Sequence, residues 1–149
     1  MSRIDLADRV IVNLAFQPEE KVLRAESGVI MIFRGKIERT PQRPVGISTG
    51  FEGWTIEPNG ALILTNRRIF FAKEGRKYLL LRVPKILLET PISMIYSVGI
   101  AEGRVRELVI ALETGTWRKN RFYFRVRDPD SWARIITELI SSRIKNERK

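Results

Sequence analysis

The chain has 149 residues, the size of a single domain, and with 44% hydrophobic and 30% charged residues its composition is that of a folded globular protein. It contains neither cysteine nor histidine, which excludes disulfides, the usual structural zinc sites, thiol nucleophiles and imidazole acid–base catalysis. The formal net charge of +10 indicates a partner that carries negative charge. Composition therefore predicts a binding module rather than an enzyme, with no cofactor and no metal.

The positive charge is concentrated in the second half of the chain. Residues 76–149 hold 16 basic and 8 acidic side chains, whereas residues 1–75 hold 11 and 9. Nineteen of the 27 cations are arginine, whose planar guanidinium binds phosphate through two hydrogen bonds at once. Two interpretations stand: a surface for the phosphates of lipid or nucleic acid, or the composition of a thermophilic protein.

No part of the sequence predicts a membrane span. The longest apolar runs, such as Val29–Phe33, are far shorter than the roughly 20 residues that a span requires. Asp5, Asp8 and Arg9 interrupt the apolar residues at the N-terminus, which is unlike a signal peptide. We expect a cytoplasmic protein whose contact with a membrane, if it makes one, is peripheral.

The first third of the chain divides into a helix, a strand and an irregular segment. Apolar residues at helical spacing over residues 1–17 predict a short N-terminal arm or amphipathic helix. A β-rich segment follows from Lys21 to Phe33. Residues 34–60 are rich in proline and glycine, which predicts a long irregular insertion rather than a second domain. We therefore expect one domain over residues 18–146.

From Gly60 onward one β-element follows another. Residues 61–64 and 69–72 predict a hairpin around Thr65–Arg68. Further strands are expected at 78–83, 92–100, 107–112 and 121–126, with 84–91 as a connection between two prolines. In the last strand Phe122 and Phe124 alternate with Arg121, Tyr123 and Arg125, which predicts one buried and one solvated face.

The C-terminal segment has the pattern of an amphipathic helix. Asp128 is a capping residue and Pro129 suits a first helical turn. Trp132, Ile136 and further apolar residues then repeat at helical spacing. Seven short strands and one closing helix predict a mainly β (α+β) fold, an antiparallel barrel or sandwich capped by the C-terminal helix.

Three segments carry a resemblance to known domains. The acidic pair in Glu19–Leu23 and the hairpin Gly60–Phe71 resemble the GRAM branch of pleckstrin-homology-like domains. The strand Gly28–Gly35 is similar to one in the GLUE domain of the ESCRT-II machinery. The resemblance covers about residues 18–143 and implies a seven-stranded barrel with a helical cap. In such domains three loops meet at the open end of the barrel, where many members bind phosphoinositide headgroups.

Basic residues lie in the three segments that the resemblance assigns to those loops. The first contributes Arg34, Lys36 and Arg39, the second Lys73, Arg76 and Lys77, and the third Arg118, Lys119 and Arg121. Converging cations would focus a positive potential and offer several donors to each phosphate. The alternative is that these side chains are ordinary solvated loop residues of a basic protein. Phe51, Trp54 and Trp117 lie in the same loops and either pack on the barrel or enter a membrane interface.

Other polar motifs have mainly structural interpretations. Glu19 and Glu20, like Asp128 and Asp130, are expected to cap or be solvated rather than to act as an acid–base pair. The turn Asn66-Arg67-Arg68 has two interpretations, a structural turn in which Asn66 tolerates a left-handed backbone or a grip on phosphate.

Three functions compete. The first is an adaptor that recognises acidic phospholipid headgroups at a membrane surface. The second is a protein-interaction domain, for example for ubiquitin or an ESCRT-type partner, whose contact would be the outer face of the terminal helix at Ser131, Arg134, Glu138 and Ser141. The third, and least favoured, is nucleic-acid binding, with bases stacking on Tyr123 between Arg121 and Arg125.

Overall fold

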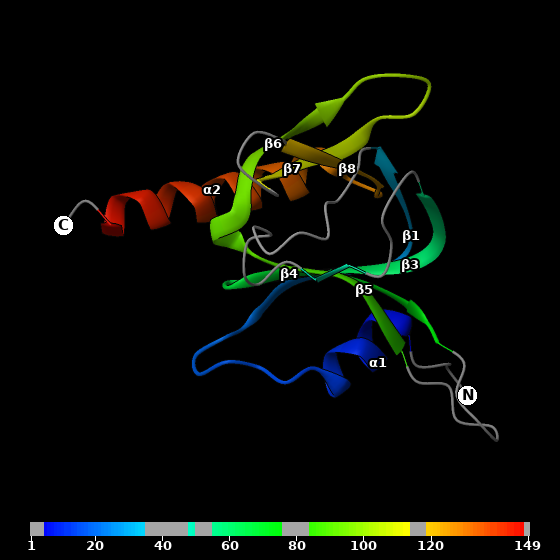
Figure 1. The fold of residues 1–149 in the computed structure, drawn as a ribbon, viewed down its shortest axis with the longest axis horizontal. Helices are drawn as coiled ribbons and strands as arrows, with labels where there is room; N and C mark the ends of the chain where they lie inside the picture. The colour runs from blue at the N-terminus through cyan, green and yellow to red at the C-terminus, as the bar shows by residue number, and fades with distance from the viewer. Residues whose placement is uncertain (1–4, 35–47, 50–54, 76–83, 114–118, 148–149) are drawn as a thin grey trace.

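The computed structural model describes residues 5–34, 48–49, 55–75, 84–113 and 119–147 (Figure 1). The elements in chain order are α1 (Leu6–Asn13), β1 (Val22–Arg34), β2 (Ser48–Thr49), β3 (Thr55–Thr65), β4 (Arg68–Glu74), β5 (Pro84–Pro91), the 3₁₀ turn η1 (Ile92–Met94), β6 (Ile95–Ala101), β7 (Glu107–Glu113), β8 (Lys119–Arg125) and α2 (Pro129–Glu147). The expected mainly β fold with a C-terminal helix is confirmed.

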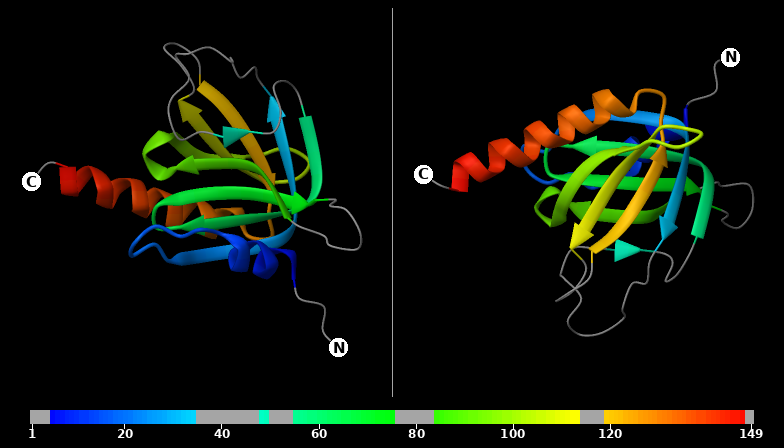
Figure 2. Two further views of the ribbon diagram at one scale, coloured as in Figure 1. Left: turned by 60° about the horizontal axis from the view of Figure 1, so that its bottom comes forward. Right: turned by 90° about the horizontal axis from the view of Figure 1, so that it is seen from above.

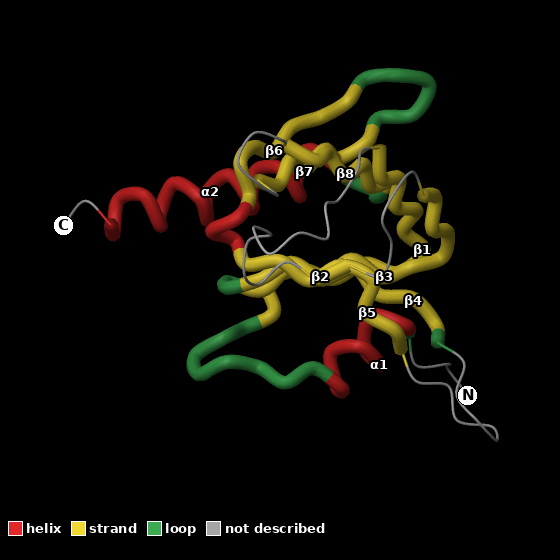
Figure 3. Tube along the Cα trace, in the orientation of Figure 1, coloured by secondary structure: helices red, strands yellow, loops and turns green. Residues whose placement is uncertain are grey.

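The strands form one antiparallel sheet in the order β2-β5-β4-β3-β1-β8-β7-β6. The sheet folds over on itself, with β6, β7 and β8 above β4 and β5 in Figure 1. The long strands β1 and β3 curve from one layer to the other, and α2 enters between the layers from the opposite, open side (Figures 1 and 2). Figure 3 shows α1 outside the lower layer. Seven of the strands are long, and the eighth, β2, is a two-residue pairing with β5.

The long strands β1 and β3 bend at positions that lie opposite each other in the sheet. In β1 the pairing register shifts between Ser27 and Val29, around Gly28, whose φ of 71° is in the left-handed region. Opposite this point Gly60 pairs with Val29, and Asn59 has a φ of 57°. A bulge with a left-handed glycine sharpens the local twist of a strand. The bend lets one sheet supply both walls of the core.

The core lies between the two layers and is closed by α2. Its inward side chains come from alternate positions of the strands, such as Phe33, Phe71 and Phe122, each fully buried. Trp132 and Ile136 of α2 are also fully buried in this cluster, as their spacing predicts. Asp128 caps the helix by accepting a hydrogen bond from the Ser131 backbone N–H at 3.2 Å. Within the described residues, no helix is long and apolar enough to cross a bilayer.

The helix α1 covers the outer face of the lower layer. Val10 packs there against Ile63, Phe70 and Ala72, which alternate along β3 and β4 with the residues of the main core. The Arg9 guanidinium forms an ion pair with Glu74 at the end of β4. The lower layer is therefore buried on both of its faces, which explains its nearly continuous run of apolar residues.

Several expected element boundaries were wrong. Residues 84–91 are the strand β5 rather than a connection, because its prolines occupy the first and last positions, where a missing N–H costs the sheet little. Residues 92–94 are a 3₁₀ turn, so the strand expected from Ile92 begins at Ile95. The last six residues of the 34–60 insertion are the start of β3. The strand expected at 78–83 lies outside the described residues.

Candidate functional site

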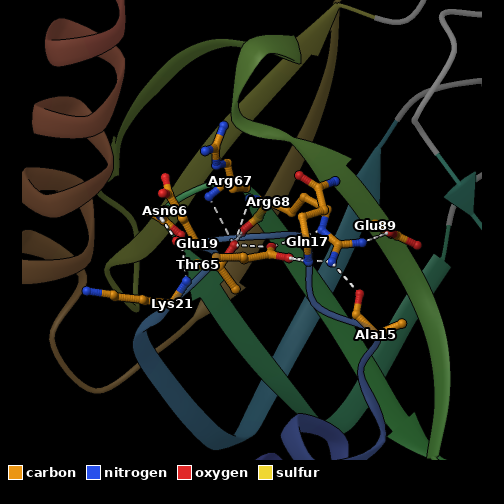
Figure 4. Close-up of polar contacts among 10 residues, drawn as sticks. Ala15, Gln17, Glu19, Lys21, Thr65, Asn66, Arg67, Arg68 and Glu89 are labelled. Atoms are coloured by element: carbon orange, nitrogen blue, oxygen red, sulfur yellow. Dashed lines mark hydrogen bonds and ion pairs between the residues drawn. The ribbon is translucent and has the colours of Figure 1, made fainter.

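The residues that carry the family resemblance meet in one buried ion-pair network (Figure 4). The Arg68 guanidinium donates to both carboxylate oxygens of Glu20, at 2.6 and 3.0 Å, and to Glu89 Oε1 at 2.6 Å. The Glu20 side chain has no exposed surface, and Thr65 Oγ1 and the Gln17 backbone N–H also donate to it, at 2.6 and 2.8 Å. The network ties the segment before β1 to the β3–β4 hairpin and to β5.

The environment of Glu20 keeps its carboxylate charged. Burial by itself raises the pKa of a carboxyl group, but the hydrogen bonds from Arg68, Thr65 and Gln17 and the positive charge of Arg68 outweigh burial. The pKa of Glu20 is lowered from 4.5 to about 2 as a result. The expectation that Glu20 is a solvated or capping residue is wrong, since it is the buried centre of the network.

Asn66 closes the same turn from its other side. Its side-chain oxygen accepts from the Lys21 backbone N–H at 2.7 Å, and its amide donates to the Glu19 carbonyl at 3.1 Å. Asn66 does not have the left-handed backbone that its residue type allows. Glu19 has it instead, with a φ of 64°, and the bond from Asn66 holds it there.

The hairpin motif is therefore structural at Arg68, whose guanidinium is occupied by two carboxylates and by the Ala15 carbonyl at 3.0 Å. The phosphate-binding interpretation is wrong for this residue. Arg67 differs, because its side chain is exposed; its backbone N–H donates to Thr65 Oγ1, and its carbonyl accepts from the Ile92 N–H. The resemblance in sequence thus records how the fold is held together rather than a ligand.

The strands that border the three predicted basic loops end on the same side of the sheet. The strands β4 and β7 run in the direction of β1, because each is separated from β1 by one antiparallel strand. Arg34 ends β1, Glu74 ends β4 and Glu113 ends β7. We call the sheet end formed by these residues, and by the starts of β3 and β8, the loop end of the sheet.

Two arginines lie directly opposite each other at the loop end. Arg34 of β1 is the pairing partner of Arg121 of β8, and Arg121 is exposed. Their neighbours Phe33 and Phe122 also pair and are fully buried in the core, so alternation along β8 places Arg121 on the outer face of the upper layer. Like charges directly opposite each other destabilise a sheet. An anion bound between them would remove that cost.

Lys73 lies on the opposite face from these two arginines. It follows the buried Phe71 by two positions, and its ammonium lies 2.8 Å from Glu57, which pairs with the buried Met31. Alternation places Lys73 and Glu57 on the inward side, at the mouth between the layers. The carboxylate of Glu57 neutralises the charge of Lys73 there. Lys73 is therefore a weaker candidate than Arg121 for binding an anionic ligand.

The remaining predicted site residues are only partly placed. The backbone of Lys119 opens β8 opposite Glu113 of β7. Lys36, Arg39, Arg76, Lys77 and Arg118 lie outside the described residues, as do Phe51, Trp54 and Trp117. Their membership of the site stays a prediction.

The residues predicted for nucleic-acid binding and for protein binding are described by the structure, and they support these two functions only in part. Arg125 lies next to Tyr123 on the same face and donates a hydrogen bond to Glu107 at 3.2 Å. Glu107 thus neutralises one of the two cations that nucleic-acid binding at Tyr123 would use. On α2, Arg134, Glu138 and Ser141 are exposed as predicted, but they form a polar surface without an aromatic anchor. The prediction was wrong for Ser131, which is half-buried and accepts a hydrogen bond from Arg24. Asp130 at the start of α2 receives two hydrogen bonds from Arg106, at 2.6 and 2.9 Å, and these lower its pKa.

Comparison with solved structures places the fold. The chain is similar to the structure described as the Vps36 N-terminal PH domain, with a TM-score of 0.57 and 12% sequence identity, over 88% of this chain and 86% of that one. No known protein-family profile matches the sequence, and no curated protein is similar to it in sequence. The expected pleckstrin-homology-like fold is thus confirmed.

Proposed function

We propose that this protein is a non-enzymatic binding module that recognises the phosphates of acidic phospholipid headgroups at a membrane surface. The observation that carries the proposal is the pair Arg34 and Arg121, opposite each other at the loop end of the sheet. The loops that the resemblance assigns to headgroup binding adjoin this end and carry the other predicted cations.

Arg121 is exposed and forms no ion pair within the part of the chain that the structure describes. Arg68, Arg125 and Lys73 each contact a carboxylate at 3.2 Å or less. Across from Arg121 the sheet offers instead Arg34 on one side and the small Ala111 on the other. Two guanidinium groups on adjacent strands suit a phosphate monoester, which can accept several charge-assisted hydrogen bonds at once. The net charge of +10 adds long-range attraction to an anionic surface.

Flotation with vesicles tests the proposal. We expect the wild type to float with phosphatidylcholine vesicles that contain phosphatidylserine or a phosphoinositide, and not with phosphatidylcholine alone. Binding should weaken as salt rises, because exposed charges are screened beyond about 8–10 Å at ordinary ionic strength. A preference for phosphoinositide over phosphatidylserine at equal charge would indicate a headgroup site rather than general attraction. Failure to float with any anionic vesicle would refute the proposal in favour of a protein partner.

A pair of charge variants locates the site. Arg121→Glu removes one cation of the opposed pair, whereas Arg134→Glu makes the same change at an exposed position on α2. Each cation close to an anionic bilayer contributes about 1 kcal/mol, so Arg121→Glu should weaken binding by roughly fivefold or more. Arg134→Glu should change it much less. Equal losses would mean that only the net charge of the protein matters.

A further inference from the structure

A row of apolar residues crosses the outer face of the upper layer, one step inward from the arginine pair. Ile56 of β3 pairs with Ile32 of β1, Ile32 pairs with Tyr123 of β8, and Tyr123 pairs with Val109 of β7. Directly opposite residues in an antiparallel sheet lie on one face. The four side chains therefore form a continuous row across four strands. Arg34 and Arg121 lie two residues along β1 and β8 from this row.

Exposure along the row is uneven. Ile32 is 5% exposed, Tyr123 and Val109 are half-buried, and Ile56 is 59% exposed. Ile56 is thus the row's most accessible apolar side chain, at the side of the sheet where β3 begins. A single exposed isoleucine is unremarkable in itself. Here it ends a row that also contains an aromatic residue, and Arg121 lies on the same face.

The face changes character one step further inward. Arg125 of β8 pairs there with Ile30 of β1 and forms an ion pair with Glu107 of β7. The face thus runs from the exposed Arg121 at the loop end, which forms no ion pair within the described residues, through an apolar row, to a neutral ion pair. Cations beside an apolar row match the two chemical layers of an anionic bilayer, in which phosphates lie outside the acyl chains.

The opposite side of the molecule offers a natural contrast. Val12 on α1 is 81% exposed, more than Ile56. Asp5 and Asp8 are exposed beside it, on the same helical face. An anionic bilayer would repel these carboxylates, so the two exposed apolar residues differ in the sign of the charge around them.

We infer that the outer face of the upper layer lies against the anionic bilayer, with Ile56 entering the boundary of the acyl chains and Tyr123 at the interface. This inference rests on the proposed function, and it adds an orientation that headgroup binding alone does not require. A module that bound a headgroup only through its loop tips would keep Ile56 in water.

Cysteine labelling tests the orientation without a background, because the chain contains no cysteine. The variants are Ile56→Cys and the control Val12→Cys, each carrying an environment-sensitive fluorophore. Vesicles of phosphatidylcholine with phosphatidylserine are added while flotation measures binding in the same samples. We expect the emission of the Ile56→Cys label to shift to the blue and to be quenched by a lipid-borne quencher. The Val12→Cys label should do neither.

A second pair of variants measures the contribution of Ile56 to affinity. Ile56→Ser should weaken vesicle binding by about tenfold, because part of an isoleucine side chain no longer leaves water. Val12→Ser should leave it unchanged. Since both positions are exposed, neither change should lower the melting temperature, which serves as the control for folding.

The outcomes separate the inference from the proposal beneath it. Binding to vesicles with no shift at Ile56→Cys, or with equal shifts at both labels, would overturn the orientation and leave headgroup recognition standing. No binding by any labelled or unlabelled protein would overturn both.

Discussion

Removal of the Arg68 side chain is the sharpest test of how the fold is held together. In the wild type its guanidinium contacts Glu20 through two hydrogen bonds and Glu89 through a third. The Glu20 side chain has no exposed surface in the wild type, and the variant Arg68→Ala leaves it with hydrogen bonds only from Thr65 and the Gln17 backbone N–H. A buried carboxylate without its cation either remains charged at a high cost or takes up a proton.

The expected magnitude follows from the general cost of breaking a buried ion pair and from the pKa of Glu20, whose lowering Arg68 shares with Thr65 and Gln17. Removing one partner of a buried ion pair typically costs about 3–5 kcal/mol. For Arg68→Ala we expect a cost on the order of 4 kcal/mol. The lowering of the Glu20 pKa from 4.5 to about 2 corresponds to a stabilisation on the order of 3 kcal/mol at neutral pH. In a chain of this length each kcal/mol lowers the melting temperature by about 2–4 °C. We therefore expect Arg68→Ala to melt roughly 10 °C below the wild type.

Urea unfolding at pH 7, followed by tryptophan fluorescence, measures this loss. The matched control is Arg67→Ala, which removes the same charge from the adjacent, exposed position of the same turn. The control should lie within about 0.5 kcal/mol of the wild type, as surface substitutions usually do. If Arg68→Ala also lies within that range, the network does not anchor the hairpin and our interpretation of the motif is wrong.

Three further predictions concern stability. Because the Glu20 pKa is lower in the folded state, the stability it contributes is complete above about pH 4.5 and is lost as the pH falls toward 2, which urea titrations across that range would show as a declining free energy of unfolding. Trp132→Ala should cost roughly 3–5 kcal/mol by emptying the core, whereas Trp132→Phe should cost less, since it mainly loses the 3.2 Å bond to Glu26; similar melting temperatures for the two variants would contradict this. Gly60→Ala should cost roughly 1–3 kcal/mol, because its Cβ would lie 2.1 Å from the ring of the fully buried Phe71, and an unchanged melting temperature would show that the ring moves aside freely.

The sequence predicts those parts of the fold whose signals are local. Asp128, Pro129 and the spacing of Trp132 and Ile136 define the start and the buried face of α2 without reference to any other element. The alternation of Phe122 and Phe124 with Arg121, Tyr123 and Arg125 likewise defines the two faces of β8. Each of these patterns is contained within a few turns of helix or a single strand.

Elements defined by their neighbours were harder to predict. The prolines at both ends of β5 suggest a connection, and only the pairing with β4 makes residues 84–91 a strand. The network around Glu20 likewise joins residues that are distant in the sequence. Arg68 lies 48 residues after Glu20, and Glu89 lies 21 residues after Arg68. The acidic pair and the Thr65–Arg68 turn could both be recognised in the sequence. The contact between Glu20 and Arg68 could not.

The candidate site shows the same division. Its cations could be listed from the sequence, and the outward position of Arg121 followed from alternation along β8. That Arg34 lies opposite Arg121 depends on the register between β1 and β8, which the sequence alone does not define. The sequence analysis did not predict the ion pair between Lys73 and Glu57, because residue 57 lay in the segment expected to be irregular.

Two double variants with the same net charge test directly whether the arginine pair forms the binding site. Arg34→Gln/Arg121→Gln removes the opposed pair, and Arg104→Gln/Arg134→Gln removes two exposed arginines from the β6–β7 loop and from α2. Their affinities for vesicles containing an anionic phospholipid are measured at one ionic strength, after melting curves have shown that both are folded. At about 1 kcal/mol for each cation near the bilayer, we predict that the first variant binds roughly thirtyfold more weakly than the wild type and the second nearly as well. Equal affinities of the two variants would contradict the assignment of the site to the arginine pair.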